Sequence, residues 1–215
     1  MEAYKIKGGK PVNGSLKGIG TKNIASKVVV ASLLTDEKVT LLNVPNILEI
    51  QILKDMLVPL GVDIQHDTDK NMMNICAKNI NSHKVLFPDS GSNRIPILMI
   101  APLLHRFKKA VVPVLGGCYL GDRKVDFHVQ ATREAGAKII GTEEGYEAEV
   151  DKFKPINIRL PYPSMGATET CLFLSVLTEG TSIIENASHE PEILETITFL
   201  RSLGAIIYIH PNRRI

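Results

Sequence analysis

The chain has 215 residues, of which 44% are hydrophobic and 22% charged, and its formal net charge is +2. These values exclude an intrinsically disordered chain, which combines low hydrophobicity with high net charge. The net charge is too small to indicate a nucleic-acid partner, although anionic small molecules remain open. The three cysteines, Cys76, Cys118 and Cys171, are odd in number and widely spaced, so they indicate neither a disulfide framework nor a zinc site.

We expect no secretory signal peptide at the N-terminus of the given sequence. The first seven, Met-Glu-Ala-Tyr-Lys-Ile-Lys, lack the apolar core of a signal peptide. The longest apolar run, 95–104, contains two prolines and is too short to cross a bilayer. We therefore expect a cytoplasmic protein with no membrane partner. Residues 3–7 alternate as a strand does, and a glycine-rich stretch follows them, so we treat 1–19 as a segment apart from the main domain, 20–215.

An internal repeat organises the main domain. A helix-like segment that ends in a glycine and precedes a β-branched strand occurs three times, at Gly61, Gly136 and Gly204. The glycines are 75 and 68 positions apart, and each has the character of a left-handed residue that ends a helix. We expect a pseudo-threefold α/β domain with repeats at about 20–89, 90–160 and 161–215. The last repeat is expected to be truncated, because 212–215 begins a strand that the chain does not finish.

Each repeat also contains a turn of small residues that opens an apolar helix. The turns lie at 20–23, 90–94 and 164–168, and the helices that they open are expected at 24–34, 95–104 and 169–177. Helices that are apolar nearly all round belong in the interior, so we expect them to be wrapped by sheet. Their N-termini present unpaired N–H groups and partial positive charge, and symmetry would gather them on one side of the domain as an anion site.

Cations accompany these helix ends. Lys22 and Arg94 occupy almost the same phase of the repeat, and Arg123 lies in a nearby glycine-rich loop. Together they would suit a ligand with phosphate and carboxylate groups, which arginine binds in bidentate fashion. The alternative is that all three are solvated surface residues, which is the commoner use of Lys and Arg. Asn23 likewise has two alternative interpretations: it binds the ligand, or it caps the helix.

The stretch 114–128 gathers several chemical groups in a short distance. Three glycines surround the thiol of Cys118, and Arg123, Asp126 and His128 follow. This pattern suits an acid or base beside an anion clamp, but it also suits a plain turn with a buried small thiol. Asp126 and His128 would share a face on a strand and would not on a helix. The other histidines show no metal-ligand spacing, and no nucleotide-binding or serine-hydrolase motif is present, so no metal and no cofactor are expected.

These motifs resemble a known family. In their order and spacing they resemble the N-terminal half of the enolpyruvyl transferases that act on UDP-N-acetylglucosamine. The stretches that carry the resemblance are 20–23, Arg94 with the following helix, 116–128, 164–168 and 185–193. The glycine–cysteine loop followed by Val-Asp-x-His distinguishes this branch from the shikimate-pathway enolpyruvyl transferase, which lacks the loop. The resemblance implies an inside-out α/β barrel built from βαβαββ units.

The resemblance also implies a role for each site residue. Cys118 would be the general acid toward C3 of phosphoenolpyruvate and the target of fosfomycin. Phosphoenolpyruvate would be held by Lys22, Arg94, Arg123 and Cys118. The UDP-sugar would contact Asn23, Arg94, Arg123, Lys124, Val125, Asp126, Phe127, His128, Ser164, Met165 and Gly166. The substrates implied are phosphoenolpyruvate and UDP-N-acetylglucosamine, with transfer of the enolpyruvyl group to the sugar 3′-hydroxyl and release of phosphate.

The chain also departs from the family pattern. The family has two domains with the site between them, 1–19 normally belongs to the second domain, and the catalytic base lies in the half that is missing. Lys124 stands where proline is usual, and Ile95-Pro96 replaces small residues. We expect the chain to be inactive without a C-terminal half, and the partner of 1–19 to be that half or a second copy. The alternatives are a non-catalytic nucleotide-sugar-binding or assembly module of the same fold and, less favoured because of Cys118, a shikimate-type transferase.

Overall fold

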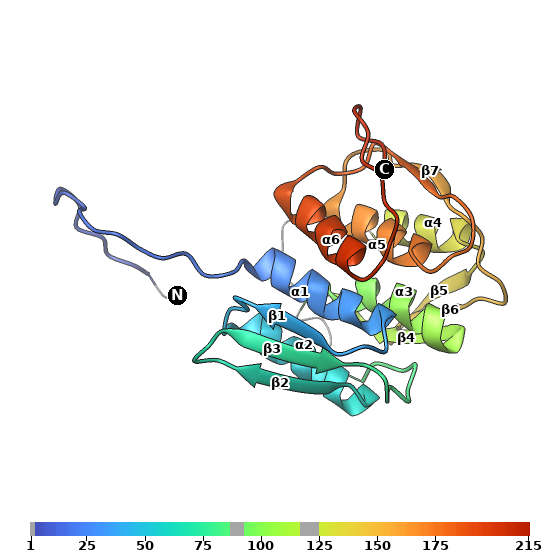
Figure 1. Cartoon of the computed structure of the whole chain (residues 1–215), viewed down its shortest axis with the longest axis horizontal. Coiled ribbons are helices and arrows are strands. Elements are labelled where there is room, and N and C mark those ends of the chain that lie inside the picture. Colours follow the sequence, from blue (N-terminus) through green and yellow to red (C-terminus); the bar gives the residue numbers. More distant parts are fainter. Residues whose placement is uncertain (1–2, 87–92, 117–124) are drawn as a thin grey trace.

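The computed structural model describes residues 3–86, 93–116 and 125–215. Helices and strands alternate along the chain (Figure 1). The elements are α1 (Lys22–Ala31), β1 (Val39–Leu42), α2 (Leu48–Leu57), β2 (Asp63–Asp67), β3 (Met72–Cys76), α3 (Pro96–Phe107), β4 (Lys109–Pro113), α4 (Asp126–Glu134), β5 (Lys138–Thr142), β6 (Gly145–Glu149), β7 (Asn157–Arg159), α5 (Met165–Ser175), β8 (Ile183–Glu185) and α6 (Pro191–Ser202), with short 3₁₀ turns at Ser32–Leu34 and Val58–Leu60. Within this part of the chain, no helix combines the length and hydrophobicity that crossing a membrane requires.

The helices α1, α3 and α5 form the interior, as their apolar sequences predict. Every residue of α3 from Pro96 to Leu104 is buried, and so is every residue of α5 from Ala167 to Leu174. The helix α3 packs against both α1 and α5. A helix with no polar face gains most from burial on all sides, since each apolar side chain removed from water contributes about 1.5–3 kcal/mol.

Three small sheets surround these helices (Figure 1). The first has the order β1-β3-β2 and the second β4-β6-β5, both antiparallel, and the third pairs β7 with β8 in parallel. In each of the first two repeats an inner helix leads to an edge strand, then to an outer helix and a hairpin. The hairpin returns its second strand to the middle of the sheet. The predicted repeat of helix and strand is therefore confirmed for the first two repeats.

The three repeat glycines occupy the predicted conformation. Gly61, Gly136 and Gly204 have φ values of +92°, +94° and +101°. After Gly61 and Gly136 a strand begins within two residues, at Asp63 and Lys138. The strand predicted after Gly204 is wrong, because 205–209 has no ladder of hydrogen bonds. In the first two repeats the strand after the glycine lies beside the central strand of its sheet. In the third repeat the backbone groups of Ile215 pair instead with those of Ile184.

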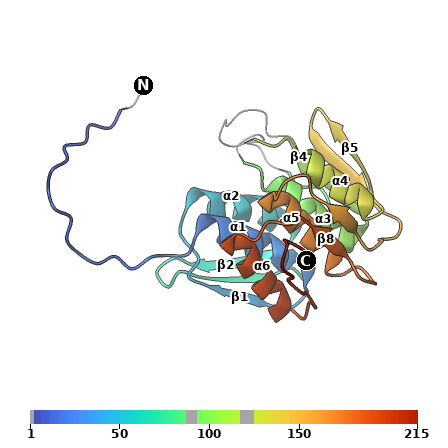
Figure 2. The same ribbon diagram turned by 90° about the horizontal axis from the view of Figure 1, so that it is seen from above.

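The strand predicted at 3–7 is also not formed. Residues 3–20 contain no helix or strand and extend away from the body of the molecule (Figure 2). Tyr4 and Ile6, which would be the buried face of that strand, are 96% and 89% exposed. An alternating pattern forms a strand only where a sheet edge is available to pair with it. Assignment of 1–19 to a second domain stays a prediction.

Candidate functional site

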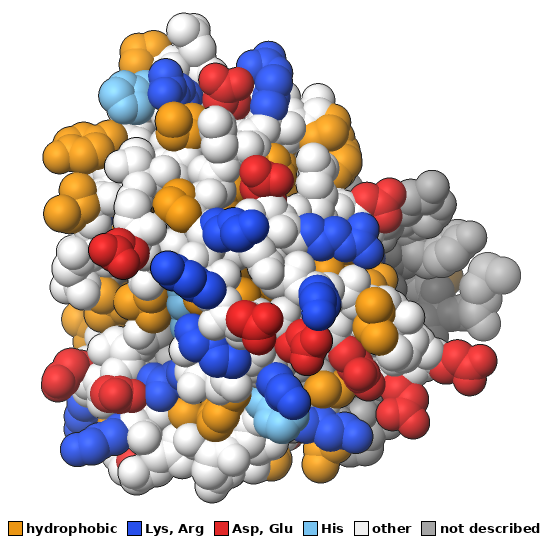
Figure 3. All heavy atoms as spheres, turned by 90° about the vertical axis from the view of Figure 1, so that its right-hand side faces the viewer, with side chains coloured by type: hydrophobic (Ala, Val, Ile, Leu, Met, Phe, Trp, Pro, Cys, Tyr) orange, Lys and Arg blue, Asp and Glu red, His pale blue; other side chains and the backbone are white. Residues whose placement is uncertain are grey.

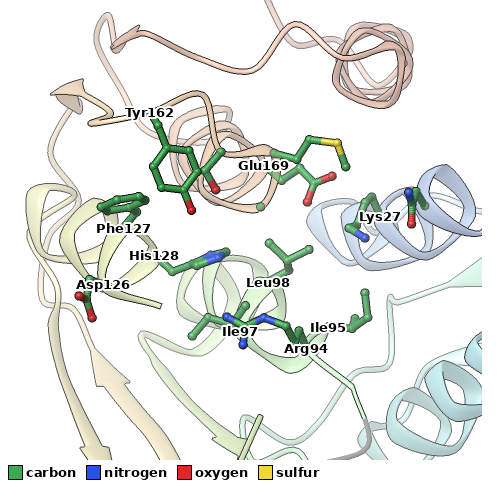
Figure 4. Close-up of a pocket in the computed structure, with 14 residues that line it drawn as sticks. Lys27, Arg94, Ile95, Ile97, Leu98, Asp126, Phe127, His128, Tyr162 and Glu169 are labelled. Atoms are coloured by element: carbon green, nitrogen blue, oxygen red, sulfur yellow. The ribbon is translucent and has the colours of Figure 1, made fainter. Parts of the chain in front are cut away.

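A pocket of about 580 Å³ opens where the inner helices begin (Figure 4). Its walls come from α1, from the start of α3, from the first turn of α4, and from Tyr162 with the start of α5. The lining residues are Asn23, Lys27, Arg94, Ile95, Ile97, Leu98, Asp126, Phe127, His128, Tyr162, Ser164, Met165, Gly166 and Glu169. Segments more than 140 residues apart in the sequence therefore meet at one site.

The local sequence explains why these helices begin here. The Thr21 side chain accepts a hydrogen bond from the N–H of Ile24, and the Ser164 side chain accepts one from Ala167, at 3.3 and 3.4 Å. Before α3, the Asn93 side chain accepts a bond of 2.9 Å from the N–H of Ile95. The Thr21 and Ser164 caps each satisfy one N–H of their helix and leave others at the helix end, whereas Asn93 binds the N–H of the residue that precedes α3. The positive ends of the helices therefore lie at the pocket, where they favour an anionic group.

Arg94 and His128 form the middle of the pocket. Burial and the charge of Arg94 lower the pKa of His128 from 6.5 to about 4, so its imidazole is neutral at neutral pH. The His128 Nδ1 lies 2.7 Å from the Thr170 hydroxyl, which holds the ring. A methyl group added at Gly166 would stand 3.0 and 3.1 Å from ring atoms of His128. Glycine at 166 thus lets the start of α5 approach the imidazole closely.

An aromatic wall closes one end of the pocket. The rings of Phe127 and Tyr162 meet edge to face, with their centroids 5.0 Å apart. In Figure 4 they lie on the opposite side of the pocket from Lys27. Aromatic faces of this kind suit a flat ring of a ligand, whereas the middle of the pocket suits an anion.

A buried carboxyl group lies toward the other end. Glu169 is fully buried, and neither of its carboxylate oxygens has a hydrogen-bond partner. Desolvation raises the pKa of Glu169 from 4.5 to about 7, Lys27 opposes this rise, and the negative charge of Glu192 adds to it.

The predicted site residues are only partly brought together. Eight line the pocket: Asn23, Arg94, Asp126, Phe127, His128, Ser164, Met165 and Gly166. Lys22 is not among the lining residues, and its ammonium group lies 2.7 Å from the Glu49 carboxylate. Val125 is buried directly before α4. Cys118, Arg123 and Lys124 lie outside the described residues. Since 126–134 is helical, Asp126 and His128 line the pocket from different faces of one turn.

The remaining lining residues were missed by sequence reasoning, most notably Lys27, Tyr162 and Glu169. A signal existed for two of them. Glu169 is a charged residue within the buried stretch Ala167–Leu174 of α5, and Lys27 lies between the buried residues Ser26 and Val28 of α1. Charged residues are rarely buried without a purpose, so a charge in a predicted interior helix is itself a mark of a site.

Comparison with known proteins agrees with this architecture. The family model described as EPSP synthase (3-phosphoshikimate 1-carboxyvinyltransferase) matches residues 6–215. The chain belongs to this family. Two curated relatives are UDP-N-acetylglucosamine 1-carboxyvinyltransferases, from Protochlamydia amoebophila at 42% identity and from Chlamydia muridarum at 40% identity. Both alignments cover 100% of this chain, and 48% and 49% of the relative. The chain therefore spans about half the length of the curated relatives it matches.

Solved structures of the family share the fold. The enolpyruvyl transferase NikO from Streptomyces tendae matches with a TM-score of 0.84 at 18% identity, over 96% of this chain and 48% of that one. An EPSP synthase from Acinetobacter baumannii matches with a TM-score of 0.66 at 20% identity, over 94% and 46%. The predicted α/β fold, an inside-out barrel with helices inside and sheets outside, is thereby confirmed. The curated relatives likewise confirm the resemblance to the N-terminal half of the enolpyruvyl transferases that act on UDP-N-acetylglucosamine.

The outer surface shows mixed charge. On the face drawn in Figure 3, several Lys and Arg side chains lie across the middle, and a row of Asp and Glu side chains runs below them toward the right. Among the described residues, no group of three His, Cys, Asp or Glu side chains is arranged to hold a metal ion. The features that define the candidate site are the helix N-termini, Arg94 and the buried carboxyl group of Glu169.

Proposed function

We propose that this chain is the N-terminal half of an enolpyruvyl transferase that acts on UDP-N-acetylglucosamine. The reaction transfers the enolpyruvyl group of phosphoenolpyruvate to the sugar 3′-hydroxyl and releases phosphate, a step in making peptidoglycan precursors. The observation that carries the proposal is the pocket, where three helix N-termini and Arg94 meet beside an aromatic wall. The names of relatives at 36–42% identity across the chain support the same substrates.

The pocket suits a nucleoside diphosphate sugar from end to end. The diphosphate would lie at the helix ends near Arg94, since these groups offer N–H donors and positive charge. The uracil ring would lie against Phe127 and Tyr162. The sugar would then extend toward Asn23 and Lys27, on the opposite side in Figure 4. A volume of about 580 Å³ falls within the usual range for small-molecule sites.

The chemistry calls for groups beyond this pocket. By resemblance, Cys118 would donate a proton to C3 of phosphoenolpyruvate, which leaves a cationic centre at C2. The sugar hydroxyl would attack C2, and loss of phosphate from C2 together with a proton from C3, which the Cys118 thiolate can take back, would give the enolpyruvyl ether. A base must accept the proton of that hydroxyl, and His128 is poorly suited because its pKa is lowered to about 4. We place the base on the C-terminal half of the enzyme, so this chain alone is expected to bind UDP-N-acetylglucosamine without turnover.

Calorimetric titration with UDP-N-acetylglucosamine tests the proposal. We expect binding by the wild-type chain and a loss of at least tenfold in affinity for Arg94→Ala, because the diphosphate loses a charged partner. Arg159→Ala is the matched control, since Arg159 is an exposed arginine paired with Glu185 away from the pocket. Binding that is absent, or equal in both variants, would refute this use of the pocket. Phosphate release by the chain alone, in contrast, would refute the need for a second half.

A further inference from the structure

Glu169 is the least satisfied polar group in the described part of the chain. Its side chain is fully buried on α5, and both carboxylate oxygens are without a hydrogen-bond partner. Burial of a carboxylate without partners is costly, and a protein that needed only packing here would be more stable with an apolar residue. The packing of α5 therefore does not explain why a glutamate occupies position 169.

The carboxyl group faces the pocket. Glu169 lines it together with Asn23 and Lys27. In Figure 4 the carboxylate and the Lys27 ammonium group point toward one another from the facing helices α5 and α1. No ion pair within 4.0 Å joins them in the described structure, and the Lys27 Nζ instead lies 3.2 Å from the Ser26 hydroxyl. Both side chains line the same pocket, but the Glu169 oxygens are buried, so a ligand reaches them only if the side chain turns toward the pocket.

The end of the pocket at Glu169 suits different ligand groups from those suited to the middle of the pocket at Arg94. Phosphate and carboxylate groups of a ligand offer only acceptors at neutral pH, so they would be repelled by a carboxylate. Hydroxyl groups and amide N–H groups are donors, and a carboxylate accepts hydrogen bonds from them strongly. An N-acetylated sugar carries both kinds of donor. The phosphates of the nucleotide part would lie instead at the helix ends and Arg94.

We propose that the Glu169 carboxylate binds the sugar directly, by accepting a hydrogen bond from a hydroxyl or the acetamido N–H, with Lys27 balancing its charge. This inference rests on the proposed function and adds a residue to it. It gives the ligand a direction in the pocket: the ring end at Phe127, the diphosphate at Arg94 and the sugar at Glu169.

The charges around Glu169 predict a pH dependence. Lys27 on α1, Arg94 before α3, His128 on α4 and Glu192 on α6 face it or the pocket beside it. The pKa of the free carboxyl is about 7, while that of His128 is about 4, so His128 stays neutral between pH 6 and 8. A ligand that needs the carboxylate ionised must displace its proton to solvent. Affinity for UDP-N-acetylglucosamine should therefore rise about tenfold from pH 6 to pH 8.

The test is a calorimetric titration of wild type, Glu169→Gln and the control Glu195→Gln, an exposed position on α6. At pH 8 we expect Glu169→Gln to lose about tenfold in affinity for UDP-N-acetylglucosamine and nothing for UDP, which lacks the sugar. The rise in affinity with pH should disappear in Glu169→Gln and persist in Glu195→Gln. Circular dichroism verifies that each variant is folded.

A second variant keeps the inference testable if Glu169→Gln does not fold. In Lys27→Met the cation that favours the ionised carboxyl is gone, so the rise in affinity should move to higher pH. The inference is overturned if wild-type affinity is independent of pH, or if Glu169→Gln weakens UDP and UDP-N-acetylglucosamine equally. Failure of wild type to bind either ligand at pH 8 would instead overturn the proposed function on which the inference rests.

Discussion

Replacement of Glu169 by glutamine should change how the stability of the unliganded chain depends on pH. The folded-state pKa is about 7 and the reference value is 4.5, so the folded state holds the proton more tightly than the unfolded state does. A raised carboxyl pKa therefore costs stability as pH rises from the unfolded pKa to the folded pKa. Between pH 5 and pH 8 the free energy of unfolding should fall by about 2–3 kcal/mol through this one group.

Glu169→Gln removes that titration and preserves the shape of the side chain. The difference in unfolding free energy between variant and wild type should grow by about 2–3 kcal/mol from pH 5 to pH 8, mostly below pH 7. Since the chain has no tryptophan, urea unfolding is best followed by far-ultraviolet circular dichroism. Other titrating groups are common to both proteins, so they cancel in the difference. Parallel stability curves over this range would refute the claim that the carboxyl is buried without a partner.

Four further substitutions test other parts of the structure. Arg94→Gln should raise the pKa of His128 above about 4 and leave it below 6.5, because burial is the larger cause; a proton NMR titration that reached 6.5 would contradict this. Gly166→Ala should displace the His128 ring and weaken UDP-N-acetylglucosamine binding roughly fivefold, and an unchanged ring resonance would argue otherwise. Gly61→Ala and Gly204→Ala should each cost about 1–2 kcal/mol for a left-handed conformation. The loss should be larger at Gly61, where the new methyl would meet a backbone oxygen at 2.6 Å, so equal urea midpoints would count against this geometry.

The repeat and the interior helices were predictable because their signals are local. A glycine that ends a helix, a small-residue cap and a run of apolar residues each act within one or two turns. Gly61, Gly136 and the helix 96–107 follow from such signals. Strands depend instead on partners elsewhere in the chain. That is why 3–7 and 205–209 have strand-like sequences and form no strand in the described structure.

The part of the site at the helix ends was predictable from the sequence, and the part formed by Lys27 and Glu169 was not. Arg94 and Ser164 were found because they begin helices of the repeat, and Phe127 and His128 because the family motif includes them. Lys27 and Glu169 lie one turn inside their helices, where only the folded structure shows that they face a pocket. Lys22 carries the same repeat phase as Arg94, yet it is paired with Glu49, a residue of α2 that no local pattern connects to it.

Alkylation by fosfomycin tests the central claim most directly, because it combines the nucleotide-sugar pocket with the predicted catalytic thiol. Cys171 is buried and its pKa is raised to about 12, so it should not react, and Cys118→Ser controls for Cys76. Intact-mass measurement should show an adduct at Cys118 that forms faster when UDP-N-acetylglucosamine is present. No adduct with or without the sugar nucleotide, while iodoacetamide still modifies Cys118, would contradict the proposal that this half carries an organised substrate site.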